Sequence, residues 1–254
     1  MPAAPPAHVD LWPDRALAIA ALGRVARHAH AATALLVGLD GSFALRLGAG
    51  DRWQRCRRAW IPAGVTHELD CGDTLMTTLY LFPLTGEPEA LAKHLGLNPS
   101  RVAVDFLLGP TVAETILATH GGDHDHGATR VWLDGWIGPP TPIEVDPRVL
   151  RAMAVLREQA ADKLGIGELA AAVGLSESRL MHHFKAGVGL PMRRVRLWER
   201  MRLLTTHVAG GDSLTQAALA AGFADSSHLS HGFRGMFGLP ASRIFNAHSR
   251  LRAS

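Results

Sequence analysis

The sequence has little cysteine and no long apolar run, and both features limit the class of protein to which it can belong. Cys56 and Cys71 are its two cysteines, too few for a disulfide framework. No apolar segment approaches the roughly 20 residues that a membrane-spanning helix needs. The first residues, MPAAPPAHVDLW, lack the basic start and apolar centre of a signal peptide. We therefore expect a cytoplasmic protein with reduced thiols and no membrane contact.

Charge is also scarce, and it is unevenly divided. Charged residues make up 19% of the 254 residues, against 47% apolar residues, which is typical of a folded globular protein. Residues 148–254 carry 15 Lys and Arg against 7 Asp and Glu, whereas residues 1–147 carry 11 against 16. The basic C-terminal part is therefore the candidate for binding a polyanion.

A proline-rich segment separates two regions of different pattern. Residues 138–147, GPPTPIEVDP, contain four prolines, which predict an irregular and stiff linker. We place one domain at residues 1–137 and a second at residues 148–254. Asp146 and Pro147 suit the first turn of a helix that opens the second domain.

The N-terminal region has the pattern of an antiparallel β domain. TALLVGLDGSFALRLG alternates and turns at Asp40-Gly41, which favours a hairpin. RAWIPAGVTHELD and TLMTTLYLFP are further short strands bounded by turn residues. We expect a small closed barrel. Two helices, near residues 86–97 and 109–120, and a last strand, TRVWLDGW, are expected to follow it.

The C-terminal region contains an internal duplication. LSESRLMHHFKAGVGLP resembles ADSSHLSHGFRGMFGLP, and four residue pairs align at a constant offset of 49. The pairs are Leu180 and Leu229, Phe184 and Phe233, Gly189 and Gly238, and Pro191 and Pro240. Each unit has a short helix, a glycine-containing turn and a second helix that Ser176 or Asp225 can cap. The pattern predicts an all-helical domain of two helix-turn-helix units.

The second helix of each unit has one apolar and one polar face. Leu180 and Phe184 face the core in the first unit, and Leu229, Phe233 and Phe237 do so in the second. The outward faces carry small hydrogen-bonding groups and cations, which suit base edges and phosphates of double-stranded DNA. These candidate DNA-binding residues are Ser178, Arg179, Met181, His182, Lys185, Ser226, Ser227, Ser230, His231 and Arg234. Between the units, PMRRVRLWERMRLLTTHV predicts a long arginine-rich helix.

Both units together resemble the DNA-binding domain of the AraC/XylS family of bacterial transcription regulators. The resemblance covers residues 148–246, and SLTQAALAAGFADSSHLSHGFRGMFGLPASRIF is similar to the family signature. Met181 and His182 depart from the arginine or glutamine frequent at such positions, which affects the bases read. The resemblance implies a non-enzymatic, sequence-specific regulator that binds an operator as a homodimer, and that contacts RNA polymerase if it is an activator.

The N-terminal region resembles a cupin-like sensor domain over residues 15–85. Pro62, Gly64 and His67 hold the spacing of the second cupin motif, and His28 and His30 hold part of the first, in which the usual glutamate is absent. The resemblance implies a small-molecule effector in the barrel and no required cofactor. Candidate effector-binding residues are His28, His30, Phe43, Trp60 and His67, with Trp132 as a further wall residue.

The residues alone leave open three other ways in which the protein could sense a signal. His28, His30 and His67 could hold a divalent metal such as zinc or nickel. THGGDHDHG contains His120, His124 and His126. This segment is either a solvated glycine-rich loop or a second metal site. Arginines beside Cys56 favour a reactive thiolate and thus oxidant sensing. A metal-dependent cupin enzyme is a remote alternative, and two distinct recognition helices argue against an architectural DNA-binding protein.

Overall fold

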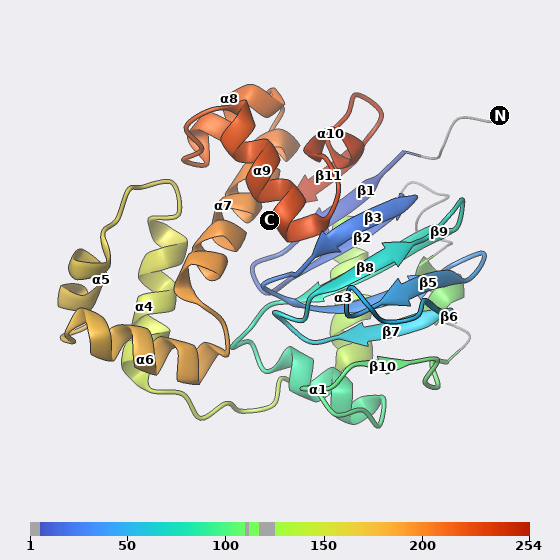
Figure 1. The fold of residues 1–254 in the computed structure, drawn as a ribbon, viewed down its shortest axis with the longest axis horizontal. Helices are drawn as coiled ribbons and strands as arrows, with labels where there is room; N and C mark the ends of the chain where they lie inside the picture. The colour runs from blue at the N-terminus through green and yellow to red at the C-terminus, as the bar shows by residue number, and fades with distance from the viewer. Residues whose placement is uncertain (1–5, 110–111, 117–124) are drawn as a thin grey trace.

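The computed structural model describes residues 6–109, 112–116 and 125–254, which form two β-sheets flanked by helices (Figure 1). A seven-stranded sheet has the order β10-β7-β4-β9-β2-β1-β11, and a four-stranded sheet has the order β3-β8-β5-β6. The first nine strands are β1 (His8–Leu11), β2 (Arg15–Ala21), β3 (Arg24–His28), β4 (Thr33–Gly38), β5 (Phe43–Arg46), β6 (Gln54–Cys56), β7 (Arg58–Ile61), β8 (His67–Asp70) and β9 (Leu75–Leu81). The last two are β10 (Ala103–Val104) and β11 (Arg250–Ala253).

The mixed α+β class is confirmed, but the closed barrel is wrong, because the edge strands of the two sheets do not pair. The predicted hairpin at Asp40-Gly41 is also wrong, because β4 and β5 lie in different sheets. β4 pairs with β7 and β9, whereas β5 pairs with β6 and β8, so the chain passes from one sheet to the other at this turn. The Asp40 carboxylate accepts a hydrogen bond from the Leu75 amide at 2.9 Å, which holds the corner against β9.

Two helices follow the sheets, α1 (Glu87–His94) and α3 (His126–Ile137), and residues 112–116 are helical as well. The segment TRVWLDGW lies within α3, so the strand expected there is wrong. Asp125 caps α3 by accepting hydrogen bonds from the Gly127 and Ala128 amides. Thr129, Leu133 and Ile137 are buried at four-residue intervals, and this helical spacing outweighs the strand preference of valine and tryptophan.

The C-terminal region forms the two expected helix-turn-helix units. Its helices are α4 (Pro147–Glu158), α5 (Ile166–Ala172), α6 (Glu177–Val188), α7 (Met192–Ala209), α8 (Leu214–Ala220), α9 (Ser226–Phe237) and α10 (Ala241–Ile244). The predicted caps are present: Ser176 accepts from Arg179 and Asp225 from His228. Ser213 likewise caps α8 by accepting from Gln216. None of the described helices is both long and apolar enough to cross a bilayer. Residues 138–146 have no helix or strand, and the division there into two domains stays a prediction.

The C-terminal region is not entirely helical, because its last residues join the sheet. β11 pairs in parallel with β1, in the register His8 to Arg250 through Leu11 to Ala253. The helix α9 lies beside β3, and α7 lies beside β1 and β11 (Figure 1). One hydrophobic cluster accordingly contains Leu36 and Met76 of the sheet together with Met201 and Phe233 of the helices. The second helix-turn-helix unit therefore shares its core with the sheets.

Candidate DNA interface and effector cavity

The second helix of each unit, α6 or α9, is held at both ends by local chemistry. Ser176 or Asp225 caps its first turn, and Gly189 or Gly238 ends it with φ near +76° or +71°. This left-handed backbone conformation strongly favours glycine. The two glycines are 49 positions apart, as the sequence repeat requires.

The polar faces of α6 and α9 point outward, as predicted. Nine of the ten candidate DNA-binding residues are exposed, and the tenth, Ser230, is half-buried. Leu180, Phe184, Leu229 and Phe233 are buried beneath them. The exposed faces are thus free to meet a ligand as large as a DNA duplex.

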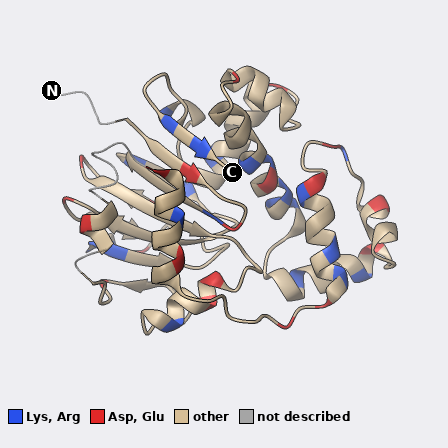
Figure 2. Ribbon diagram, turned by 180° about the vertical axis from the view of Figure 1, so that it is seen from behind, with Lys and Arg blue, Asp and Glu red and all other residues tan. Residues whose placement is uncertain are grey.

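A cationic groove joins the two exposed faces across α7. Met181 and Lys185 of α6 line one side of this groove, and His228 and His231 of α9 line the other. Arg193, Arg194, Arg196 and Arg200 of α7 lie between them. Figure 2 shows Lys and Arg recurring along the C-terminal helices. This distribution of charge suits a polyanion that crosses both units.

The arginines of α7 divide into two groups. Arg194 donates to the Ala29 carbonyl at 2.6 Å, and Arg200 donates to the Ala160 and Asp162 carbonyls. Arg202 donates to Glu199 at 2.6 Å. Each of these three guanidinium groups donates within the protein, Arg202 through one of its Nη atoms, which leaves Arg193 and Arg196 as the better candidates for phosphate contacts.

A cavity of about 100 Å³ lies between the seven-stranded sheet and the helices α7 and α9. Its walls are mainly apolar, with Ala18, Leu36, Met76 and Tyr80 from the strands. The helices contribute Trp198, Met201, Arg202, Thr205, Phe233 and Phe237. Arg202 brings a polar group to this wall, and its Nε is buried without a hydrogen-bond partner.

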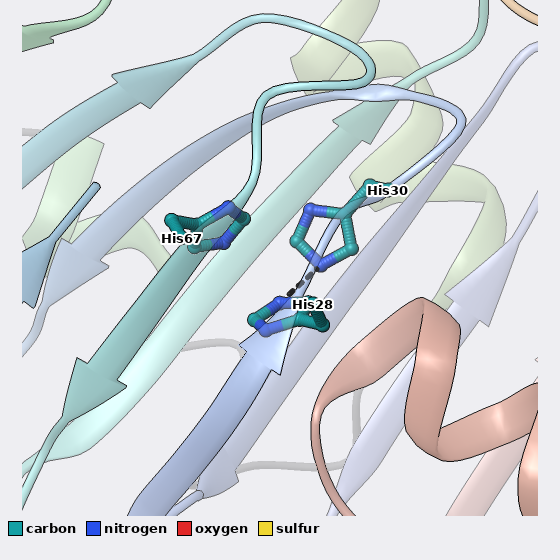
Figure 3. A group of neighbouring side chains, drawn as sticks. All are labelled: His28, His30 and His67. Atoms are coloured by element: carbon teal, nitrogen blue, oxygen red, sulfur yellow. Dashed lines mark hydrogen bonds between the residues drawn. The ribbon is translucent and has the colours of Figure 1, made fainter. Parts of the chain in front are cut away.

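His28, His30 and His67 converge at one end of this region, and the first two line the cavity (Figure 3). His28 and His67 face each other across the β3–β8 pair, and His30 follows β3. All three are buried, and His28 Nε2 lies 3.1 Å from His30 Nε2. Burial lowers the pKa of His28 to about 3 and lowers the pKa values of His30 and His67, so the three rings are neutral at pH 7.

The other predicted effector residues lie elsewhere. Phe43 is buried in the hydrophobic core that contains Leu36 and Met76, and Trp60 is buried in a different cluster with residues of α1 and α3. Neither lines the cavity. Trp132 stacks on Trp136 of the same helix with ring centroids 5.9 Å apart, also away from it. These aromatic residues pack the domain core.

Of the three histidines in THGGDHDHG, His126 lies in the part of the chain that the structure describes. His120 and His124 lie outside the described residues. His126 begins α3, its Nδ1 lies 2.7 Å from an Asp10 carboxylate oxygen, and its ring stacks on Trp12. Among the described residues, the His28, His30 and His67 group is the one with metal-ligand geometry.

The surroundings of the cysteines do not support the alternative of a reactive thiolate. Cys56 and Cys71 are both buried in the hydrophobic core. Burial, with a smaller effect of nearby Asp105, raises the pKa of Cys56 to about 12, and burial likewise raises the pKa of Cys71 to about 12. The arginines adjacent in sequence do not offset this cost, so the thiols stay protonated at neutral pH.

The comparison with known proteins agrees with the helical geometry. Residues 169–247 match the model of a helix-turn-helix domain family. Residues 169–247 are an AraC-type helix-turn-helix domain. This AraC-type domain includes α6 and α9, whose outward faces the sequence predicted to bind DNA. The sequence matches no curated protein.

Solved structures extend the similarity beyond the AraC-type domain. ToxT from Vibrio cholerae O395 is 9% identical, covering 92% of this chain and 99% of that chain with a TM-score of 0.61. ToxT of Vibrio cholerae strain SCE256 with bound unsaturated fatty acid is also 9% identical, covering 94% and 98% with a TM-score of 0.60. An AraC-type regulator from Chromobacterium violaceum is 24% identical over 38% of this chain and 92% of that chain, with a TM-score of 0.35. The ToxT likeness shows a shared fold.

Sequence reasoning missed the part that α7 and α9 take in forming the cavity. Trp198, Met201 and Phe233 have the spacing of core residues, and they are indeed buried. Phe237 was assigned to the same core, yet it is half-buried, and its ring centroid lies 5.9 Å from that of His30. Periodicity identifies an apolar face, but it does not tell a core from the wall of a cavity.

Proposed function

We propose that this protein is a sequence-specific transcription regulator whose DNA binding responds to an apolar small molecule. The observation that carries the proposal is the shared cavity, because it is lined both by the seven-stranded sheet, here called the sensor sheet, and by α9, the second recognition helix. A molecule that enters contacts both parts and changes how they fit together. This differential contact is what effector control requires.

DNA binding is assigned to the exposed faces of α6 and α9 and to the groove between them. Lys185 and Arg234 lie on these faces, while Arg193 and Arg196 are placed to contact phosphates. A rigid α7 would set the spacing of the two recognition helices, which must meet successive major grooves roughly 34 Å apart on one face of the duplex. A homodimer, and contact with RNA polymerase if the protein activates, belong to the same proposal.

The DNA assignment is tested with sites selected from a random-sequence pool. The full-length chain should bind a selected site at physiological salt at least about 10³-fold more tightly than random DNA. Lys185→Ala and Arg234→Ala should each weaken specific binding by about 1–3 kcal/mol. Arg55→Ala, which removes the same charge from β6, should leave binding unchanged. Equal affinity for selected and random DNA would refute sequence-specific regulation.

The chemistry of the cavity favours an apolar molecule with a carboxylate. Most of the wall is hydrocarbon or aromatic, and Arg202 offers an unpartnered buried donor. Solved ToxT structures hold an unsaturated fatty acid or (E)-4-(8-methylnaphthalen-1-yl)but-3-enoic acid, which are ligands of this class. We extend that class to this chain on the strength of the Arg202 position.

The size of the cavity indicates how such a ligand would act. Pockets for drug-sized ligands span roughly 300–1,000 Å³, whereas this cavity holds about 100 Å³. A fatty acid could enter only if α7 and α9 moved away from the sheet. Ligand binding would therefore change the position of α9 relative to the sensor sheet, and with it the geometry presented to DNA.

A matched pair of ligands tests the effector class. A cis-hexadecenoic acid and the corresponding alcohol are titrated while the fluorescence of the chain is recorded, since Trp198 lines the cavity. The acid should bind at least about tenfold more tightly than the alcohol, as a charge-assisted hydrogen bond to Arg202 predicts. Arg202→Gln should remove this preference and retain alcohol binding. Equal binding of acid and alcohol by the unsubstituted chain would contradict the carboxylate.

The homodimer is tested by sedimentation of the full-length chain with and without the selected DNA. Two chains per site are expected. A single chain bound to the complete site would contradict the dimer while leaving specific DNA binding intact.

A further inference from the structure

The three buried histidines have the arrangement of a metal-ligand set. One ring nitrogen of each of His28, His30 and His67 lies within 4.8 Å of the others. The rings are 4%, 4% and 0% exposed, and they point toward one another (Figure 3). Buried polar atoms normally have hydrogen-bond partners, yet His67 Nε2 and His30 Nδ1 have none.

Backbone carbonyls fix the proton positions of two of the rings. His28 Nδ1 lies 2.8 Å from the Ala26 carbonyl oxygen, and His67 Nδ1 lies 3.0 Å from the Val65 carbonyl oxygen. Each Nδ1 must therefore carry the proton and donate it, because a carbonyl oxygen only accepts. Nε2 of both rings is then unprotonated, and the Nε2 lone pair of His28 accepts from His30. A metal-binding histidine has the same arrangement, with the ring N–H that faces away from the ion donated to a carbonyl or carboxylate.

We propose that a divalent transition metal ion binds between Nε2 of His28, His30 and His67. The Nε2 atoms of His28 and His30 are 3.1 Å apart. This is close to the roughly 3.3 Å that two nitrogens take when each lies about 2.0–2.1 Å from a tetrahedral ion. His30 donates its Nε2 proton to His28 without the ion. On metal binding its proton moves to Nδ1, so the ion replaces one weak hydrogen bond and no proton is released.

The surroundings of the cluster select the type of ion. The ligands are neutral imidazoles, and the Arg194 cation lies close enough to His30 to lower its pKa further. None of these neighbours has a negative charge that would attract the ion. Affinity must therefore come from coordination by the imidazole nitrogens. Imidazole ligands suit zinc and nickel, whereas magnesium and calcium prefer oxygen.

The site lies under the AraC-type domain, which gives the ion a regulatory position. The Ala26 amide donates to the Gly238 carbonyl at 2.8 Å, and Arg194 of α7 donates to the Ala29 carbonyl at 2.6 Å. The residues on either side of His28 thus hold the end of α9 and the start of α7. An ion that fixes His28 and His30 would stabilise this docking surface. Only this consequence for DNA binding rests on the proposed function.

The site is tested by titrating chelator-treated full-length protein with Zn²⁺ in competition with a chromophoric chelator, and with Co²⁺ by visible absorption. One ion per chain is expected, with the strong visible bands of four-coordinate Co²⁺. His28→Gln and His67→Gln should each weaken binding at least about tenfold. Zn²⁺ should raise the melting temperature of the unsubstituted chain and of neither variant. Circular dichroism establishes that the variants fold, and His30→Gln replaces any that does not.

A histidine outside the cluster provides the control. His126→Gln should bind Zn²⁺ as the unsubstituted chain does. Failure of Zn²⁺ and Co²⁺ to bind saturably, or undiminished binding by the folded cluster variants, would overturn the proposal. Loss of binding in His126→Gln would also overturn it and would move the site to the 120–126 segment. Binding to selected DNA is measured in parallel, so that failure of the metal site is distinguished from failure of the regulator.

Discussion

Gly238 shows at the residue scale how one position serves both the helix and its docking. Its φ of +71° ends α9, and a Cβ placed there would lie 2.3 Å from the Ala26 carbonyl oxygen. Gly189 is the equivalent residue of α6, with φ of +76°, and a Cβ placed on it would have no neighbour within 4 Å. The two glycines have the same backbone requirement and differ in what surrounds them.

This difference predicts unequal costs for the same substitution. Gly189→Ala should lower the free energy of unfolding by about 1–2 kcal/mol, the cost of the left-handed conformation. Gly238→Ala should lower it by clearly more, because the backbone of β3 must move as well. Chemical denaturation of both variants measures the difference. Equal losses of the free energy of unfolding would show that the end of α9 does not contact β3 closely in solution.

The cysteines lead to a second residue-scale prediction. A pKa near 12 lowers the thiolate fraction at pH 8 by about 10³-fold relative to a thiol with a pKa near 9. Cys56 and Cys71 should therefore react with iodoacetamide at least that much more slowly in the folded chain than after denaturation. Mass spectrometry of timed samples gives both rates. Rapid labelling of native Cys56 would restore the thiol-sensing alternative.

At the scale of elements, α7 connects the DNA interface to the cavity. The predicted helix is present, and its buried stripe of Val195, Trp198, Met201 and Leu204 has helical spacing. Its arginines could not be ranked in the same way, because the acceptors of Arg194 and Arg200 lie 165 and at least 38 residues away in sequence. Local pattern establishes the helix, and distant carbonyls decide which charges remain for DNA.

The ranking of these arginines is open to measurement. If Arg193 and Arg196 each contact a phosphate, Arg193→Gln and Arg196→Gln should each reduce the slope of log K against log salt by about 0.9. Arg52→Gln, in the loop between β5 and β6, is the control and should leave the slope unchanged. An unaltered slope in both α7 variants would place the phosphate contacts on other residues.

At the scale of the whole molecule, the chain closes on itself through its last residues. β11 pairs with β1, and the Arg250 and Ser254 amides donate to the Ala7 and Leu11 carbonyls at 2.8 and 3.1 Å. The tail that follows the AraC-type domain is thus a strand of the seven-stranded sheet. It adds a backbone connection to the side-chain packing of α7 and α9.

Removal of residues 250–254 should loosen this connection. β1 would become an edge strand, so its amides that face β11 should exchange with deuterium faster, and the melting temperature should fall. A chain with Arg250→Ala and Arg252→Ala keeps the backbone hydrogen bonds and should exchange as the unsubstituted chain does. Unchanged exchange across residues 6–11 in the truncated chain would mean that β11 contributes little.

The sequence by itself determined the features that depend on near neighbours. Ser176, Ser213 and Asp225 cap helices because the amides that they accept from lie within three residues, and buried residues at intervals of three and four mark helix faces. The 49-residue repeat likewise identified both recognition helices and their outward residues. α3 was missed because aromatic and β-branched residues masked its four-residue period.

Only the tertiary structure decided the features that join distant segments. The sheet to which each strand belongs and the cavity shared with α9 depend on contacts between segments far apart in sequence. His28, His30 and His67 were grouped by motif spacing, but the β3–β8 pairing decides that they meet. The β1–β11 pair joins the two ends of the chain. Burial and backbone hydrogen bonding over the whole molecule select such contacts. The periodicity of one segment does not reveal them.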